Sequence, residues 1–221
     1  SRVKYFDQIF QEKELPLEGY LELEFKHIRH EVMIRVFEYI YSGVIRLNLE
    51  NVLDILAVAN EFGISSLKKI CCDYIQNYIE VENVCNILTL SAEMNCPTLK
   101  NNCLKFIDKN AQQVLSTKGF LDLNEDILIE IIQRDELEIT EELNLFLAVI
   151  EWMNSKNSTS YLKIFSHIRF PMMTKNQLSS IVEPLNIVPQ ELLLEAYKYH
   201  LIPHKVSSKS TRFIKRNYKN L

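Results

Sequence analysis

Hydrophobic residues recur at helical spacing along most of this chain, and the clearest example is residues 31–75. Two consecutive segments each carry an apolar stripe, the first with Val32, Val36, Phe37 and Ile40 and the second with Val52, Ile55, Leu56 and Ala59. This spacing places the apolar side chains on one face of a helix. Gly43 and Gly63 follow the two segments, where glycine adopts positive φ without a steric penalty. The stretch therefore predicts helix, glycine turn, short strand, helix, turn and a third helix.

The residues before and between these helices add three further expectations. SRVKYFDQIF (1–10) is in helical register, with Phe6 and Phe10 four residues apart on one face. YLELEF (20–25) alternates apolar residues with glutamates, as a half-buried strand does. Asn48 precedes the second helix, and its side-chain oxygen can accept from an amide that lacks an intrahelical partner. We therefore expect Asn48 to be the N-cap of that helix.

The pattern stays helical from Glu80 onward. The predicted helices lie within 81–95, 98–115, 125–133, 141–153, 161–168, 174–182 and 189–200. They follow one another as consecutive pairs without a sequence repeat of fixed period. No linker rich in Pro, Gly or Ser marks the boundary near residue 79, so we expect the two parts to pack continuously.

Composition supports a helical protein and limits its partners. Only four glycines and six prolines occur in 221 residues, which disfavours an architecture of strands and turns. The net charge of -4 hides an asymmetry, because residues 203–221 hold six basic residues and no acid, leaving 19 basic against 29 acidic residues in 1–202. An acidic body does not suit a nucleic-acid platform, so we expect no nucleic-acid partner. We expect the basic tail to be solvated or to lead into a further domain.

The cysteines and the longest apolar runs indicate the compartment. The five cysteines form no CxxC pair and are not spaced as zinc ligands, so we expect buried, reduced thiols and a reducing compartment, cytoplasmic or nuclear. No uninterrupted apolar run approaches the roughly 20 residues of a membrane span, so we expect no membrane partner.

Candidate chemistry is sparse. His27 and His30 have an HxxH spacing, but further metal ligands are not evident nearby. Cys71 and Cys72 lie inside a helical pattern, where packing explains them better than nucleophilic catalysis does. The acidic run 135–142 is explained by a solvated loop and a helix N-terminus. We therefore expect no enzyme, no metal and no cofactor, and a surface that binds proteins.

Residues 37–60 carry a resemblance to a known family. FEYIYSG (37–43) and ENVLDILAVAN (50–60) closely resemble the C-terminal half of a BTB (POZ) domain. SRVKYFDQIF resembles the preceding BTB helix, and YLELEF resembles the strand after that helix. The resemblance implies a truncated BTB/POZ domain over 1–79, with one or two short strands.

Residues 80–202 resemble a BACK domain, the module of paired helices that commonly follows BTB. ENVCNILTLSAEMNCPTLKNNCLKFI and IRFPMMTKNQLSSIVEP carry this resemblance, together with the segments FLDLNEDILIEII and EELNLFLAVIEWM. The resemblance implies a mainly α fold, with α+β character at the N-terminus, followed by an all-helical BACK domain and a basic C-terminal tail over 203–221. No kelch repeats follow, so we expect relatives that carry another C-terminal domain or none.

The resemblance also implies a function. BTB–BACK modules in that family are adaptors: the BTB part pairs with itself and docks on a cullin scaffold of the cullin-3 type, and a further domain recruits a substrate protein for ubiquitination. Tyr41 matches a family position on the cullin-facing surface. The family's apolar-x-Glu motif has its nearest fits at Pro16-Leu17-Glu18 and at Phe10-Gln11-Glu12, so Phe10, Leu17 and Glu18 join Tyr41 as candidate site residues.

Two points separate this chain from the family pattern. The chain starts about halfway into the BTB domain, so we do not expect the family's homodimer to form from this polypeptide. The poor apolar-x-Glu fit leaves an alternative open, in which BTB–BACK assembles a cytoskeletal, transcriptional or signalling complex with no role in ubiquitination.

Overall fold

The computed structural model describes residues 24–157, 159, 161–202 and 211–216, and these residues are mainly helical. The chain divides into two compact units. Unit 1 comprises Ser1–Ile79 and Ser91–Lys100, and unit 2 comprises Glu80–Leu90 and Asn101–Leu221. The expectation of a mainly α fold is confirmed.

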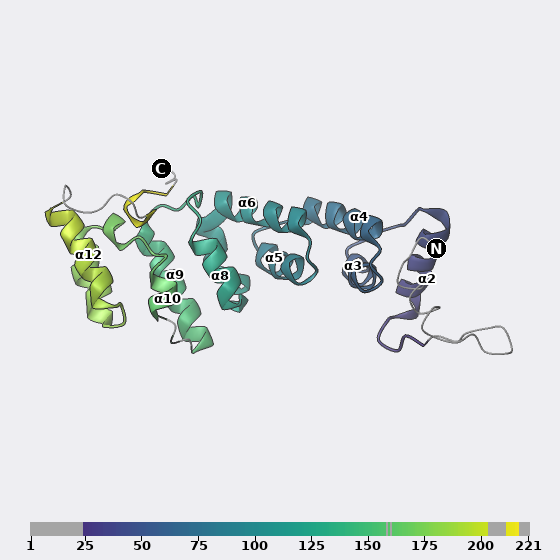
Figure 1. The fold of residues 1–221 in the computed structure, drawn as a ribbon, viewed down its shortest axis with the longest axis horizontal. Coiled ribbons are helices and arrows are strands. Elements are labelled where there is room, and N and C mark those ends of the chain that lie inside the picture. The colour runs from purple at the N-terminus through teal and green to yellow at the C-terminus, as the bar shows by residue number, and fades with distance from the viewer. Residues whose placement is uncertain (1–23, 158, 160, 203–210, 217–221) are drawn as a thin grey trace. The chain divides into compact units, whose positions relative to one another are not determined.

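Unit 1 is built on three helices that the apolar stripes of residues 31–75 predict. Helix α3 packs against both α2 and α4 (Figure 1). The residues buried at these contacts are spaced three and four apart, as in Ile55, Leu56 and Ala59 of α3. The helices are α2 (His30–Ser42), α3 (Val52–Glu61) and α4 (Ser65–Ile75), and the short 3₁₀ helix η1 (Gln76–Tyr78) follows.

The ends of these helices confirm two predictions and correct two others. Gly43 and Gly63 have φ of 76° and 64°, the left-handed conformation expected of them. Asn48 is not the N-cap of α3, because that helix starts at Val52 and Asn51 precedes it. Asn48 Oδ1 instead accepts from the Asn51 N–H at 2.9 Å, which caps the turn that leads into the helix. The short strand expected after Gly43 is also wrong, since residues 44–48 have no regular secondary structure.

Unit 2 contains the later helical pairs. Local capping explains where several of them begin: Thr117 and Asn124 accept from the N–H of Phe120 and Ile127 respectively. Its α-helices are α7 (Lys118–Asp122), α8 (Glu125–Ile132), α9 (Glu142–Lys156), α10 (Tyr161–Phe165), α11 (Lys175–Gln177) and α12 (Gln190–Leu201). It also contains the π-helix η3 (Leu178–Val182) and the 3₁₀ helices η2 (Phe170–Met172), η4 (Glu183–Leu185) and η6 (Thr211–Phe213). Helices α5 (Val84–Glu93) and α6 (Pro97–Val114) are each divided between the two units.

An aromatic cluster forms part of the core of unit 2. Phe146 lies 5.6 Å from Phe165 and 5.5 Å from Phe170 between ring centroids, and all three rings are buried. Trp152 of the same helix is 2% exposed and donates from Nε1 to the Leu123 carbonyl at 2.9 Å. Trp152 is therefore an anchor of the core.

The short segment 211–216, yellow in Figure 1, corrects two expectations about charge. Its turn η6 packs against η2, and Arg216 is buried against the carboxylate of Glu142. The expectation of a solvated basic tail is therefore wrong for Arg216. Glu142, at the end of the acidic run 135–142, lies in the first turn of α9 as expected, but it is 1% exposed, so the expectation of solvation is wrong for this residue.

All five cysteines are free and buried, which confirms the expectation drawn from their spacing. Burial raises the pKa of Cys71, Cys85 and Cys103 to about 12 in each case. Because the thiolate is the reactive form, we expect alkylation by iodoacetamide near pH 8.5 to be at least about 100-fold slower in the native protein than in urea. Mass spectrometry of the labelled cysteines measures the two rates, and equal rates would contradict burial of the thiols.

The raised thiol pKa values also set the direction of a pH dependence. The native state retains protons that the unfolded state loses above its ordinary thiol pKa of about 8.5. The stabilisation is therefore complete below that pH and is lost as pH rises toward about 12. The urea concentration at the midpoint of unfolding is therefore expected to decrease as the pH is raised from neutral to alkaline.

Candidate protein-interaction site

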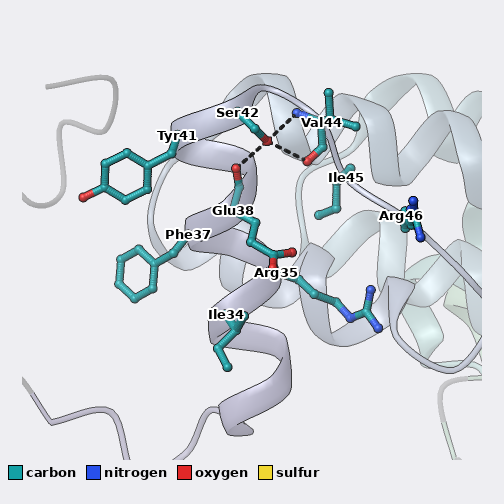
Figure 2. Close-up of a pocket in the computed structure, with 9 residues that line it drawn as sticks. All are labelled: Ile34, Arg35, Phe37, Glu38, Tyr41, Ser42, Val44, Ile45 and Arg46. Atoms are coloured by element: carbon teal, nitrogen blue, oxygen red, sulfur yellow. Dashed lines mark hydrogen bonds between the residues drawn. The ribbon is translucent and has the colours of Figure 1, made fainter.

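Helix α2 presents opposite faces to the core and to solvent. Val32 and Val36 are buried. The other face carries Ile34, Phe37 and Tyr41, which are 44%, 38% and 86% exposed. These positions are three and four residues apart, so they form one stripe along the helix, and Figure 2 shows the Phe37 and Tyr41 rings projecting to the same side.

A set of short hydrogen bonds fixes the end of α2. The Gly43 N–H donates to the Tyr39 carbonyl at 2.8 Å. Ser42 Oγ donates to the Glu38 carbonyl at 2.6 Å and accepts from the Val44 N–H at 3.1 Å, as drawn in Figure 2. The last turn of the helix is thereby joined to the segment that follows it. This arrangement holds Tyr41 at an ordered helix end rather than on a loose loop.

An open groove of about 810 Å³ runs beside this stripe (Figure 2). The apolar part of the groove wall consists mainly of the exposed stripe of α2 and of Val44, which is 69% exposed. Arg35, Arg46 and Glu38 supply its charge, which sums to one positive charge. The groove is lined by Ile34, Arg35, Phe37, Glu38, Tyr41, Ser42, Val44, Ile45 and Arg46. Its apolar wall and small positive charge suit contact with another protein.

The structure places one of the four candidate site residues. Tyr41 lies at the groove and is exposed. Phe10, Leu17 and Glu18 lie outside the described residues. Sequence reasoning missed Ile34 and Val44, and it assigned Phe37 to the core-facing stripe, although 38% of Phe37 is exposed. The apolar residues at positions 34, 37 and 41 were a usable signal, because together they give α2 a second apolar stripe.

His27, the first histidine of the HxxH spacing, lies beside a carboxylate. His27 Nε2 lies 3.0 Å from a carboxylate oxygen of Glu61, and Arg29 pairs with Asp54 on the same side of the unit. Across the residues that the structure describes, there is no group of three or more His, Cys, Asp or Glu side chains arranged to hold a metal ion.

Among the helices of those residues, none has both the length and the apolar composition needed to cross a membrane.

Comparisons with known proteins identify the class. A profile described as BTB/POZ domain matches residues 1–79, and a profile described as BACK (BTB And C-terminal Kelch) matches residues 84–183. The chain therefore belongs to the BTB–BACK proteins, and the family expected from residues 37–60 is confirmed. The assignment supports a role in protein–protein interaction.

Individual relatives can be named as well. BTB/POZ domain-containing protein 9 of Bos taurus and of Homo sapiens are each 27% identical over 201 residues, or 90% of this chain and 33% of the relative. Kelch-like protein 3 of Mus musculus is 26% identical over 190 residues, or 82% of this chain and 32% of the relative. The chain thus spans about a third of the length of these relatives.

Proposed function

We propose that this protein is an adaptor of a cullin ubiquitin ligase of the cullin-3 type, and that it docks on the cullin scaffold through the α2 surface around Tyr41. A second, unidentified protein is the substrate that the adaptor brings to the ligase. The observation that carries the proposal is the exposure of Tyr41, which is 86% at an ordered helix end. The resemblance of FEYIYSG to the family's motif supports the proposal, because it matches Tyr41 to a scaffold-facing position.

The chemistry of the α2 surface supports docking of a protein partner. A large aromatic ring supplies contact area at a low cost in conformational entropy, and tyrosine is enriched among residues that dominate binding energy. Phe37 and Ile34 extend the apolar area on one side of Tyr41, and Val44 extends it on the other. A partner helix that covers this stripe would exclude water from the Tyr41 ring, which is the condition for a large contribution to affinity.

Replacing Tyr41 with alanine tests the proposal. We expect binding to the purified N-terminal region of a cullin-3-type scaffold to weaken by about 30-fold or more, because truncation of a central aromatic residue costs about 2 kcal/mol or more. Calorimetric titration of both proteins against the scaffold gives the two dissociation constants.

Two matched variants complete this experiment. Tyr41→Phe keeps the ring and should retain most of the affinity. Tyr78→Ala removes another tyrosine of unit 1 that is 41% exposed but does not line the groove, and it should leave binding unchanged. The proposal is wrong if the wild-type protein does not bind the scaffold or if Tyr41→Ala binds as tightly as the wild type.

A second candidate function is a BTB–BACK scaffold that assembles a cytoskeletal, transcriptional or signalling complex without ubiquitination. The poor fit of Leu17-Glu18 to the family's apolar-x-Glu motif favours it. Absence of scaffold binding, combined with capture of a different partner that depends on Tyr41, would select this second function.

A further inference from the structure

Three hydrogen-bond acceptors of unit 2 surround a small pocket in the interior of that unit. The carboxylate of Glu142, in the first turn of α9, forms one side. The backbone carbonyl oxygens of Arg134 and His167 form the others. The guanidinium of Arg216 fills this pocket, and the side chains of both Arg216 and Glu142 are 0% exposed.

The contacts match the planar fork of a guanidinium. Arg216 Nε donates to Glu142 Oε2 at 3.0 Å and Nη2 donates to Oε1 at 3.2 Å, so the carboxylate is bound by two parallel hydrogen bonds. Nη2 also donates to the His167 carbonyl at 3.0 Å, and Nη1 donates to the Arg134 carbonyl. A lysine ammonium has no planar array of donors that could reach these three groups together.

Contacts that do not involve Arg216 hold the Glu142 carboxylate in place. Glu142 Oε1 accepts from the Arg169 backbone N–H at 2.9 Å, and the position of Glu142 at the start of α9 places its negative charge at the positive end of the helix dipole. The Arg169 side chain, which is 2% exposed, pairs with Asp135 and donates from Nη1 to the Ile214 carbonyl at 2.7 Å. A second buried arginine therefore connects the same C-terminal segment to the rest of unit 2.

The imidazole of His167 adds no further charge near the guanidinium at neutral pH. Burial, followed by the charges of Arg216, Arg212 and Lys163, lowers the pKa of His167 below its ordinary value. The neutral ring is the form that can lie close to these cations without strong repulsion.

We propose that unit 2 contains a guanidinium-binding pocket, formed by Glu142 and by the carbonyls of Arg134 and His167, and that its ligand is Arg216 of the same chain. The BACK match ends at residue 183, so it includes the pocket but not the ligand. The segment 211–216 is thus a ligand bound in cis, and unit 2 is complete only when that segment is docked.

Chemical rescue of an Arg216→Ala variant of the full chain tests the proposal. Truncation at Cβ removes a group equivalent to ethylguanidinium, so this small cation should enter the vacated pocket. We expect the melting temperature to fall by about 5 °C or more in the variant, since the change leaves a buried carboxylate without its partner. Added ethylguanidinium should raise it again in a saturable manner, as a ligand specific for the native state does. Fluorescence of Trp152, the single tryptophan of the chain, follows the unfolding of unit 2.

Two controls isolate the guanidinium shape. Ethylammonium carries the same charge without the planar fork and should give no rescue of Arg216→Ala. Arg212→Ala removes an arginine from the same segment whose pair with Glu195 is partly exposed, at 27% and 26%, so it should change the melting temperature little and should not respond to ethylguanidinium. Equal rescue by both cations, or no loss of stability in Arg216→Ala, would overturn the proposal.

A second measurement needs no substitution and remains decisive if Arg216→Ala does not fold. Trypsin must take the arginine side chain into its specificity pocket, so it should cleave after Arg216 far more slowly in the native wild-type chain than in a synthetic peptide of residues 209–221, because the Arg216 side chain is 0% exposed. Equal cleavage rates at Arg216 in the chain and in the peptide, read by mass spectrometry, would mean that the pocket is not stably occupied by Arg216.

Discussion

Replacing Glu142 with alanine is expected to lower the free energy of unfolding of unit 2 by about 3–5 kcal/mol. The reason is electrostatic, because the Arg216 guanidinium would stay buried with two carbonyl acceptors but without its counter-charge. The Arg169 N–H would lose its acceptor as well. Urea titration followed by Trp152 fluorescence measures the change at constant m-value.

The neighbouring residue supplies the control for this experiment. Glu141 accepts a hydrogen bond from Gln177 at an exposed position, so Glu141→Gln should change the stability by less than about 1 kcal/mol. The double variant Glu142→Leu with Arg216→Met should be more stable than the sum of the single changes predicts, because it leaves no unpaired buried charge. A loss below about 1 kcal/mol in Glu142→Ala would show that the pair is solvated in solution.

Phe146→Ala is expected to destabilise unit 2 by a similar amount, about 3–5 kcal/mol, for a different reason. The ring is fully buried, with centroids 5.6 Å from Phe165 and 5.5 Å from Phe170, so its removal leaves a cavity and deletes both aromatic contacts. The same urea titration measures the effect.

The next residue along α9 gives a matched comparison for Phe146→Ala. Leu147 is 44% exposed, so Leu147→Ala should lower the free energy of unfolding by about 0.5 kcal/mol or less. Both substitutions put alanine in the helix, so both change the helix propensity in the same direction. Comparable losses in the two variants would contradict the packing of Phe146 in the aromatic cluster.

Local patterns predicted the parts of the fold that depend on neighbours in sequence. The stripe Ile55, Leu56 and Ala59 identified the buried face of α3, and Gly43 and Gly63 were recognised because a left-handed backbone conformation strongly favours glycine. Tyr41 was identified through a family resemblance, and its exposure agrees with a role at a surface.

The errors arose where more than one arrangement satisfies the same local pattern. Asn48 was expected to cap α3 directly, but a turn intervenes and its side chain caps that turn instead. Phe37 was assigned to the buried stripe because it falls at helical spacing with the other apolar residues of that segment, and 38% of it is exposed. Helical spacing alone does not determine which side of the helix packs against another element. The width of the buried face is fixed by tertiary packing.

The pairing of Arg216 with Glu142 could not be predicted from local sequence. The two residues are 74 positions apart, and the C-terminal segment has the composition of a solvated basic tail. The acid that receives Arg216 is selected by the three-dimensional placement of α9 and of two backbone carbonyls.

The separation of 74 residues also has a consequence for synthesis on the ribosome. Helix α9 emerges and can pack its apolar face well before Arg216 has been translated. Throughout that interval the Glu142 carboxylate has no guanidinium partner, and burying it alone is strongly unfavourable. We therefore expect the start of α9 to stay hydrated in the nascent unit until the segment that carries Arg216 docks and expels that water.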